Sequence, residues 1–217
     1  MTLRGMLCFI GSGLTVVAAA PTPTEVLARA TAYHDPHGEW AALEDTTFHF
    51  IETRPGAENK TVTMVLNNRT TSMRLDRNGT EAYAITRESC TVIAGERDAA
   101  RGLMLRNYYL YLWGLPMKLH DADTPLDAEV TTAEIDGAAC DVIRVVYEQD
   151  TWYFFIDQQT GRMRRYTFYK DEAAGKGELI KLEDEIQVGS MRIPQKRSWY
   201  TLPGMKYLGT DILTKTE

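Results

Sequence analysis

The chain has 217 residues, of which 44% are hydrophobic and 25% are charged, and it carries a formal net charge of −6. This length suits one domain with a full hydrophobic core, and the composition is neither that of a disordered chain nor that of a bundle of membrane helices. An acidic balance without clusters of Lys or Arg argues against a nucleic-acid partner, which requires a basic surface.

The first twenty residues have the pattern of a signal peptide. Arg4 supplies the positively charged start, and Met6 to Val17 is apolar and rich in small residues. We expect cleavage near Ala19 or Ala20. No later segment reaches the length of a transmembrane helix. The sequence therefore predicts export to the periplasm or secretion, with residues 21–217 forming a single domain.

The next segment is predicted to be a helix from Thr24 to Tyr33. Thr24 is the expected N-cap, and Pro36 ends the helix because it disfavours helical geometry at the residue before it. The apolar stripe of this helix repeats about every 3.6 residues. Its members are Val26, Leu27, Ala30 and Tyr33.

Hydrophobic and polar residues then alternate from Phe48 to Ala94, and the alternation resumes from Val130 to Leu213. A period of two is typical of strands with one buried face, and turn sequences such as Asn78-Gly79 and Asp136-Gly137 separate the runs. This criterion indicates about ten or eleven strands, mostly joined by connections short enough for hairpins. The economical arrangement is a single antiparallel sheet.

An uncharged segment interrupts the strands. Between Arg106 and Lys118 the chain reads NYYLYLWGLPM, and its apolar residues fall on every side of a helix. Such a helix must be buried, and about eleven uncharged residues are too few to span a bilayer. Gly114 and Pro116 are expected to end this helix. We refer to residues 101–121 as the apolar segment.

A sheet of this size must curl or close. One face of the later strands is apolar, whereas residues such as Tyr153 and Lys181 lie on the opposite face. The apolar positions are Trp152, Phe154, Ile156, Tyr166, Phe168, Ile180 and Leu182. The predicted fold class is therefore α+β: a strongly curved antiparallel half-barrel wrapped around two main helices, with the apolar segment filling the concave side.

Cys90 and Cys140 remain after removal of the signal peptide, and export permits a disulfide between them. A bridge requires Cα atoms within about 7 Å, which the sequence does not establish. A disulfide and two free thiols in separate strands are therefore both open.

Motifs spread over most of the chain resemble an uncharacterised group of exported proteins, mostly from Bacteroidetes-type bacteria. The motifs are Tyr33-His34-Asp35-Pro36 with Gly38 and Trp40, Tyr111 to Leu119, Asp150 to Phe154, Ile193-Pro194, Trp199-Tyr200, and Gly209 to Leu213. That group in turn resembles the periplasmic lipoprotein carriers of the LolA and LolB type. In those carriers an incomplete barrel wraps around helices and leaves a hydrophobic cavity for acyl chains. The arginine that gates the LolA cavity has no matching position in this sequence.

The resemblance implies an apolar binding site in the concave face, for a lipid or a lipidated protein partner that contacts the membrane transiently. The expected lining consists of Leu103, Tyr108, Tyr111, Trp113, Leu115, Met117, Trp152, Phe154, Tyr166, Phe168 and Trp199. We expect no cofactor, metal or catalytic residue. Gly114 and Pro116 permit the apolar segment to act as a movable lid, and a fixed plug is the alternative.

Two further functions stay open. The first is a structural or interaction module whose cavity is filled by its own helix. The second is a hydrolase-type enzyme on the same scaffold that uses His34 or His120 with nearby carboxylates. The spacing of His34, Asp35 and His37 supplies no third metal ligand, and a helix-ending turn explains these residues better. No nucleophile elbow, phosphate loop or dinucleotide fingerprint is present.

Overall fold

The computed structural model describes residues 20–217, so the predicted signal peptide, apart from Ala20, lies outside the described residues. The described chain forms one twelve-stranded antiparallel sheet. Its strands are β1 (Thr46–Thr53), β2 (Lys60–Asn67), β3 (Ser72–Arg77), β4 (Glu81–Ile85), β5 (Cys90–Ala94), β6 (Leu126–Ile135), β7 (Ala138–Val146), β8 (Thr151–Asp157), β9 (Met163–Asp171), β10 (Lys176–Val188), β11 (Met191–Leu202) and β12 (Tyr207–Thr216). The helices are α1 (Pro23–His34), α2 (Glu39–Ala42), α3 (Ala99–Trp113) and the short 3₁₀ helix η1 (Met117–His120).

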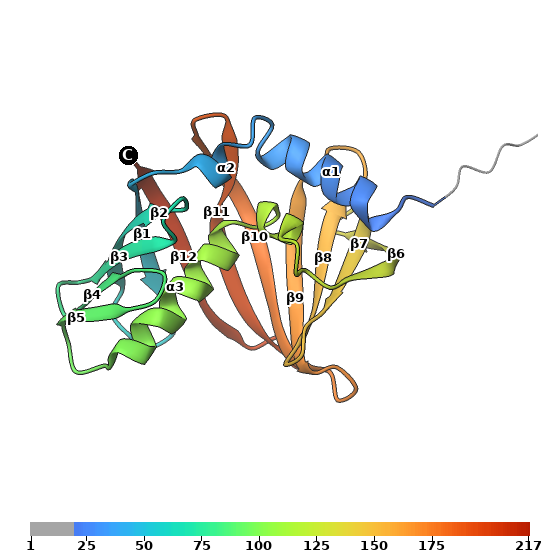
Figure 1. The fold of residues 1–217 in the computed structure, drawn as a ribbon. Helices are drawn as coiled ribbons and strands as arrows, with labels where there is room; N and C mark the ends of the chain where they lie inside the picture. The colour runs from blue at the N-terminus through green and yellow to red at the C-terminus, as the bar shows by residue number, and fades with distance from the viewer. Residues whose placement is uncertain (1–19) are drawn as a thin grey trace, which may run out of the picture.

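The strand order is β5-β4-β3-β2-β1-β12-β11-β10-β9-β8-β7-β6. Two meanders are therefore joined where the first strand, β1, pairs with the last strand, β12. The sheet curves without closing, α3 crosses its concave side, and α1 lies along one end of that side (Figure 1). The predicted α+β class and the curved antiparallel half-barrel are confirmed.

The predicted number of strands was too low. The shortest strands, β4 and β5, have five residues each. Val92 and Ile93 of β5 are exposed because β5 is an edge strand. The predicted alternation from Phe48 to Ala94 nevertheless extends over this strand.

The concave side holds two hydrophobic cores. The amino-terminal core lies on β1 to β4 and includes Phe48, Phe50 and Leu75. The carboxy-terminal core lies on β7 to β11 and includes Phe154 and Tyr166. The strand residues of each core fall largely at alternate positions, as a period of two requires for a sheet with one buried face.

Helix α3 packs between the two cores and presents a different side to each. Leu105, Tyr109 and Trp113, each four residues apart, belong to the amino-terminal core. Leu112 belongs to the carboxy-terminal core. Burial on two sides explains why the second half of this helix is apolar all round.

Helix α1 begins with a capping box. The Thr22 Oγ1 accepts a hydrogen bond from the Glu25 N–H (3.3 Å), and the Thr22 N–H donates to the Glu25 Oε2 (2.8 Å). The predicted N-cap, Thr24, was wrong, because Pro23 occupies the first helical turn and Glu25 is the third residue after the cap. Three of the four predicted stripe residues, Val26, Leu27 and Ala30, nevertheless enter the carboxy-terminal core, whereas Tyr33 is half-buried outside it and His34 is buried instead.

The two cysteines within residues 20–217, Cys90 and Cys140, are free thiols. Cys90 lies in the edge strand β5, and Cys140 lies in β7, next to the opposite edge strand. Of the two open alternatives, the structure has the unbridged one, because the width of the sheet separates the two residues. Within residues 20–217, no helix has the length and apolar character that crossing a membrane requires.

Candidate functional site

A continuous row of aromatic side chains lies on the concave face beside α3. Tyr108 stacks on Trp199 with ring centroids 5.9 Å apart, and Trp199 meets the edge of Tyr166 at 6.5 Å. Tyr166 stacks on Trp152 at 5.8 Å, and Trp152 contacts Tyr111 at 5.3 Å. We call these five residues the aromatic row. It begins and ends on α3 and crosses β11, β9 and β8 in between.

The strand register explains why these rings meet. Trp152 of β8 is opposite Phe168 of β9, and Phe154 is opposite Tyr166. Directly opposed side chains in an antiparallel pair lie about 5 Å apart, which brings large rings into contact. Phe168 and Phe154 accordingly flank Trp152 at centroid distances of 4.7 and 6.0 Å.

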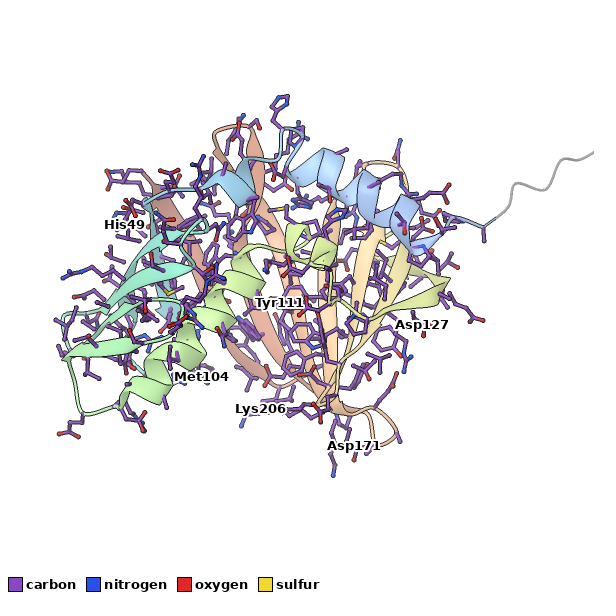
Figure 2. The ribbon with its side chains drawn as sticks, in the orientation of Figure 1. His49, Met104, Tyr111, Asp127, Asp171 and Lys206 are labelled. Carbon is purple, nitrogen blue, oxygen red and sulfur yellow. The ribbon has the colours of Figure 1, made fainter. Side chains whose placement is uncertain are left out.

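The aromatic row is only partly covered. Trp199 and Tyr166 are buried, whereas Trp152 and Tyr111 are half-buried and Tyr108 is 38% exposed. Figure 2 shows Tyr111 near the middle of the concave side, whereas Met104 lies on the outer side of α3. Full burial of residues 107–117 was therefore a wrong expectation at Tyr108 and Tyr111, because no element between residues 20 and 217 covers the outer side of α3 there.

Pockets lie on both sides of α3. A pocket of about 490 Å³ is lined by Tyr108 together with Leu105, Tyr109, Glu52 and Arg54. A second pocket of about 300 Å³ is lined by the other end of the aromatic row, with Tyr111, Trp152, Tyr147, Lys118 and Asp121 among its residues. The aromatic row thus connects two surface pockets beneath the helix.

The predicted lining separates into two groups. Tyr108, Tyr111, Trp152, Phe154, Tyr166, Phe168 and Trp199 come together in and around the aromatic row. Trp113, Met117 and the half-buried Leu103 pack in the amino-terminal core, and Leu115 packs in the carboxy-terminal core. The structure therefore places these last four as packing residues around α3 rather than along the aromatic row.

The sequence prediction did not include a buried charged network beneath α3. Arg77 Nη2 donates to Glu52 (3.0 Å) and to the Tyr109 hydroxyl (3.0 Å), and that hydroxyl donates to Glu52 (2.7 Å). Burial disfavours the charged form of Arg77, but Tyr109, Glu52 and Glu81 outweigh it and raise the pKa of the guanidinium. The network fixes one side of α3 to β1 and β3.

A second charged pair lies on the neighbouring strands. Arg54 Nη2 donates to the Asp211 carboxylate (2.9 Å). Burial raises the pKa of Asp211, although Arg54 partly counteracts the shift. Register places Asp211 opposite Glu52 on one side and opposite Arg197 on the other. The sequence did contain one indication that these charged residues face the concave side. They continue the alternate positions of the apolar residues in their strands, and alternate residues of a strand share one face.

The histidines of the enzyme alternative have structural partners. His34 Nδ1 donates to the Arg192 carbonyl oxygen (2.7 Å), and its Nε2 accepts from the Met163 N–H (2.9 Å). His120 Nε2 is bonded to the Thr31 hydroxyl at 2.7 Å. His120 does line a pocket with Asp35, but both Asp35 oxygens accept backbone N–H groups of α2. No cluster of three metal-ligating side chains occurs between residues 20 and 217.

Two solved structures share this fold. A LolA superfamily protein from Nitrosomonas europaea has a TM-score of 0.58 and 10% identity, with 91% of this chain and 94% of that chain covered. A DUF1329 family protein from Desulfovibrio piger ATCC 29098 has a TM-score of 0.51 and 9% identity, with 89% and 92% covered. These likenesses confirm the predicted LolA-like fold.

No curated protein matches the chain. The predicted resemblance to an uncharacterised family is confirmed by a family model that matches residues 6–216. The chain therefore belongs to the family described as "Family of unknown function (DUF6503)".

Proposed function

We propose that this protein binds and carries a lipid, the acyl chains of a lipoprotein or another apolar ligand in the concave face of its half-barrel. The observation that carries the proposal is the aromatic row, which is open at both ends into pockets beside α3. The LolA-like fold supports the same function. In this proposal the protein acts in the periplasm or outside the cell, and its partner is a lipid or a lipidated protein presented at a membrane.

The driving force is the transfer of acyl chains out of water. Each buried CH₂ group contributes about 0.8 kcal/mol, so a chain of moderate length suffices for specific binding. Aromatic rings offer large apolar faces at a low cost in conformational entropy. A ligand along the row would cover Trp152 and Tyr108, which now expose apolar surface to solvent.

Access to the middle of the row requires movement of α3. This helix covers Trp199 and Tyr166 in the present conformation. Its outer side is exposed at Met104, and no helix or strand of the described residues lies over it (Figure 1). The helix therefore serves in this proposal as a lid that a ligand displaces.

The first test is lipid extraction and native mass spectrometry of the protein purified from its natural compartment, followed by titration with a fluorescent fatty acid. We expect a co-purifying apolar ligand and saturable probe binding. Trp152→Ala should weaken probe binding, because Trp152 contacts four other rings. Phe155→Ala is the matched control, because Phe155 is on the same strand but belongs to a cluster on the opposite face. Absence of both a bound ligand and probe binding would refute the proposal.

The alternative of a structural module with a filled cavity has one observation in its favour. Tyr109, Leu112 and Trp113 are each at most 3% exposed, so this part of α3 is firmly packed. Hydrogen exchange distinguishes the two functions, because a displaced lid loses its backbone protection when the ligand binds. Unchanged exchange of residues 99–113 at saturating fatty acid would identify α3 as a fixed plug.

A further inference from the structure

Arg197 is a fully buried cation with few partners. Its side chain is 2% exposed, and it makes one hydrogen bond, from Nη1 to the Pro194 carbonyl oxygen (2.9 Å). Its Nε is buried without a partner. A guanidinium has five N–H donors, and leaving a buried charge unpaired is destabilising. The position therefore calls for an acceptor that residues 20–217 do not provide.

Other buried arginines in the described chain are better satisfied. Arg77 donates to two carboxylates and a tyrosine hydroxyl. Arg106 donates to two backbone carbonyls and to the Asn107 side chain. The poor pairing of Arg197 is thus a property of its location on the concave face, where β11 turns its alternate residues toward the ligand site.

The nearest candidate carboxylate is already engaged. Register places Arg197 directly opposite Asp211 in the β11–β12 pair, but the Asp211 carboxylate is paired with Arg54 at 2.9 Å. The Arg197 guanidinium instead lies over the Trp113 ring, with its central carbon 3.8 Å from the ring centroid. The Trp113 side chain of α3 therefore occupies the position over the Arg197 guanidinium where a negatively charged group would be most favourable.

Two further polar groups are unpaired beside Arg197. The Tyr166 hydroxyl and the Trp199 Nε1 are buried without hydrogen-bond partners. Trp199 lies two residues after Arg197 and so shares its face of β11, and the Trp199 ring contacts the Tyr166 ring. All three groups can donate a hydrogen bond, and all belong to the concave face at the inner part of the aromatic row.

We infer that Arg197, Tyr166 and Trp199 bind the anionic group, a carboxylate or a phosphate ester, of an amphiphile whose apolar chain lies along the aromatic row. The inference rests on the proposed function and names the class of ligand. Displacement of α3 removes Trp113 from the guanidinium, and the anion of the ligand then takes its place. Charge-assisted hydrogen bonds from a guanidinium to a carboxylate or phosphate are among the strongest available in proteins.

The test compares a dansyl-labelled undecanoic acid with its methyl ester on the full-length chain. The two probes have the same chain and differ in the charge of one end. Wild-type protein is expected to bind the acid about tenfold more tightly than the ester, the scale of one charge-assisted contact. Arg197→Met should abolish this preference and retain binding of the ester, because Met keeps most of the aliphatic volume of the side chain.

Arg165→Met is the matched control. Arg165 is half-buried, its guanidinium carbon also lies over an aromatic ring, 4.3 Å from the Phe155 centroid, and its Nε also lacks a partner. It lies on β9 beside the cluster on the convex face, however, so its loss should leave the preference for the acid intact. Tyr166→Phe keeps the aromatic row and removes one donor; it should reduce the preference a few-fold, and it provides the test if Arg197→Met does not fold.

The possible results distinguish the proposed anion site from the proposed carrier function. Equal binding of acid and ester by the wild type would overturn the anion site and leave the carrier function standing. Failure of both probes to bind would count against the carrier function itself. Inorganic phosphate at the concentration of the probe is expected not to displace the acid, and displacement by phosphate alone would assign the site to a free anion instead of an amphiphile.

Discussion

Asp35 shows how a single side chain positions the elements at one end of the concave face. Asp35 is 4% exposed, and its carboxylate accepts hydrogen bonds from the backbone N–H groups of Glu39 (2.7 Å) and Trp40 (3.0 Å). Asp35→Ala would leave two buried donors unpaired, so we expect the free energy of unfolding to fall by about 2–4 kcal/mol. Asp98→Ala removes an exposed cap of α3 and should cost only about 1 kcal/mol. Urea unfolding measures both; equal losses would contradict the role assigned to burial.

His34 makes stability depend on pH near neutrality. Burial lowers the pKa of its imidazole, whose two nitrogens are both hydrogen-bonded. As the pH drops below about 6.5, His34 is protonated in the unfolded chain but stays neutral in the folded chain. The free energy of unfolding therefore falls as the pH drops below that value. Glu178 and Asp211 have the opposite effect, because burial raises the pKa of each carboxyl. NMR titration of the His34 ring isolates its contribution, and a folded-state pKa at or above the ordinary value would refute this prediction.

At the scale of elements, Gly102 sets the distance between α3 and the edge of the sheet. A Cβ at this position would lie 2.9 Å from Tyr83 Cδ1 and in severe contact with Cys90 Sγ. Gly102→Ala should therefore destabilise the protein by about 1–3 kcal/mol and push the first half of α3 outward. If α3 is the lid, the same change should increase fatty-acid affinity as stability falls. Reduced stability with unchanged affinity would support a fixed plug.

A double-mutant cycle provides the control for this prediction. Cys90→Ala removes the sulfur that the new methyl group meets, so it should restore part of the stability lost by Gly102→Ala. The contact with Tyr83 persists, and rescue is expected to be incomplete. If the effects of the two substitutions on the free energy of unfolding are strictly additive, contact with the Cys90 sulfur is not the cause of the destabilisation by Gly102→Ala.

At the scale of the whole molecule, the sheet keeps the two thiols apart. Cys90 and Cys140 lie near opposite edges, and both are free. We expect the midpoint of urea unfolding to be the same with and without a reducing agent, because no cross-link constrains the unfolded chain. Thiol quantification under denaturing conditions should find both groups reactive. A shift of the midpoint on reduction would contradict the arrangement.

The alternation of residues such as Trp152, Phe154 and Phe168 was sufficient to predict the curved sheet and most of the aromatic row, because a period of two reports directly which face is buried. The helix prediction missed the Thr22 cap although the spacing of Thr22 and Glu25 was visible. The sequence did not predict the contacts of the buried charged residues. Glu52 and Asp211 become neighbours only when the first and last strands pair, and Arg197 faces Asp211 across the β11–β12 hairpin; single-strand patterns carry no information about either register.

The pairing of β1 with β12 has a consequence for how the chain acquires its structure. The two meanders are each built from local hairpins, but their joint needs residues 46–53 and 207–216 together. Such a non-local contact is slow to form because the intervening loop must first be closed. The joint also carries Asp211 and Glu52, whose charges are satisfied by Arg54 and Arg77. The β1–β12 pairing is the least local contact in the sheet, so we expect it to form late in folding, and a chain that lacks its final strand leaves the two meanders unjoined.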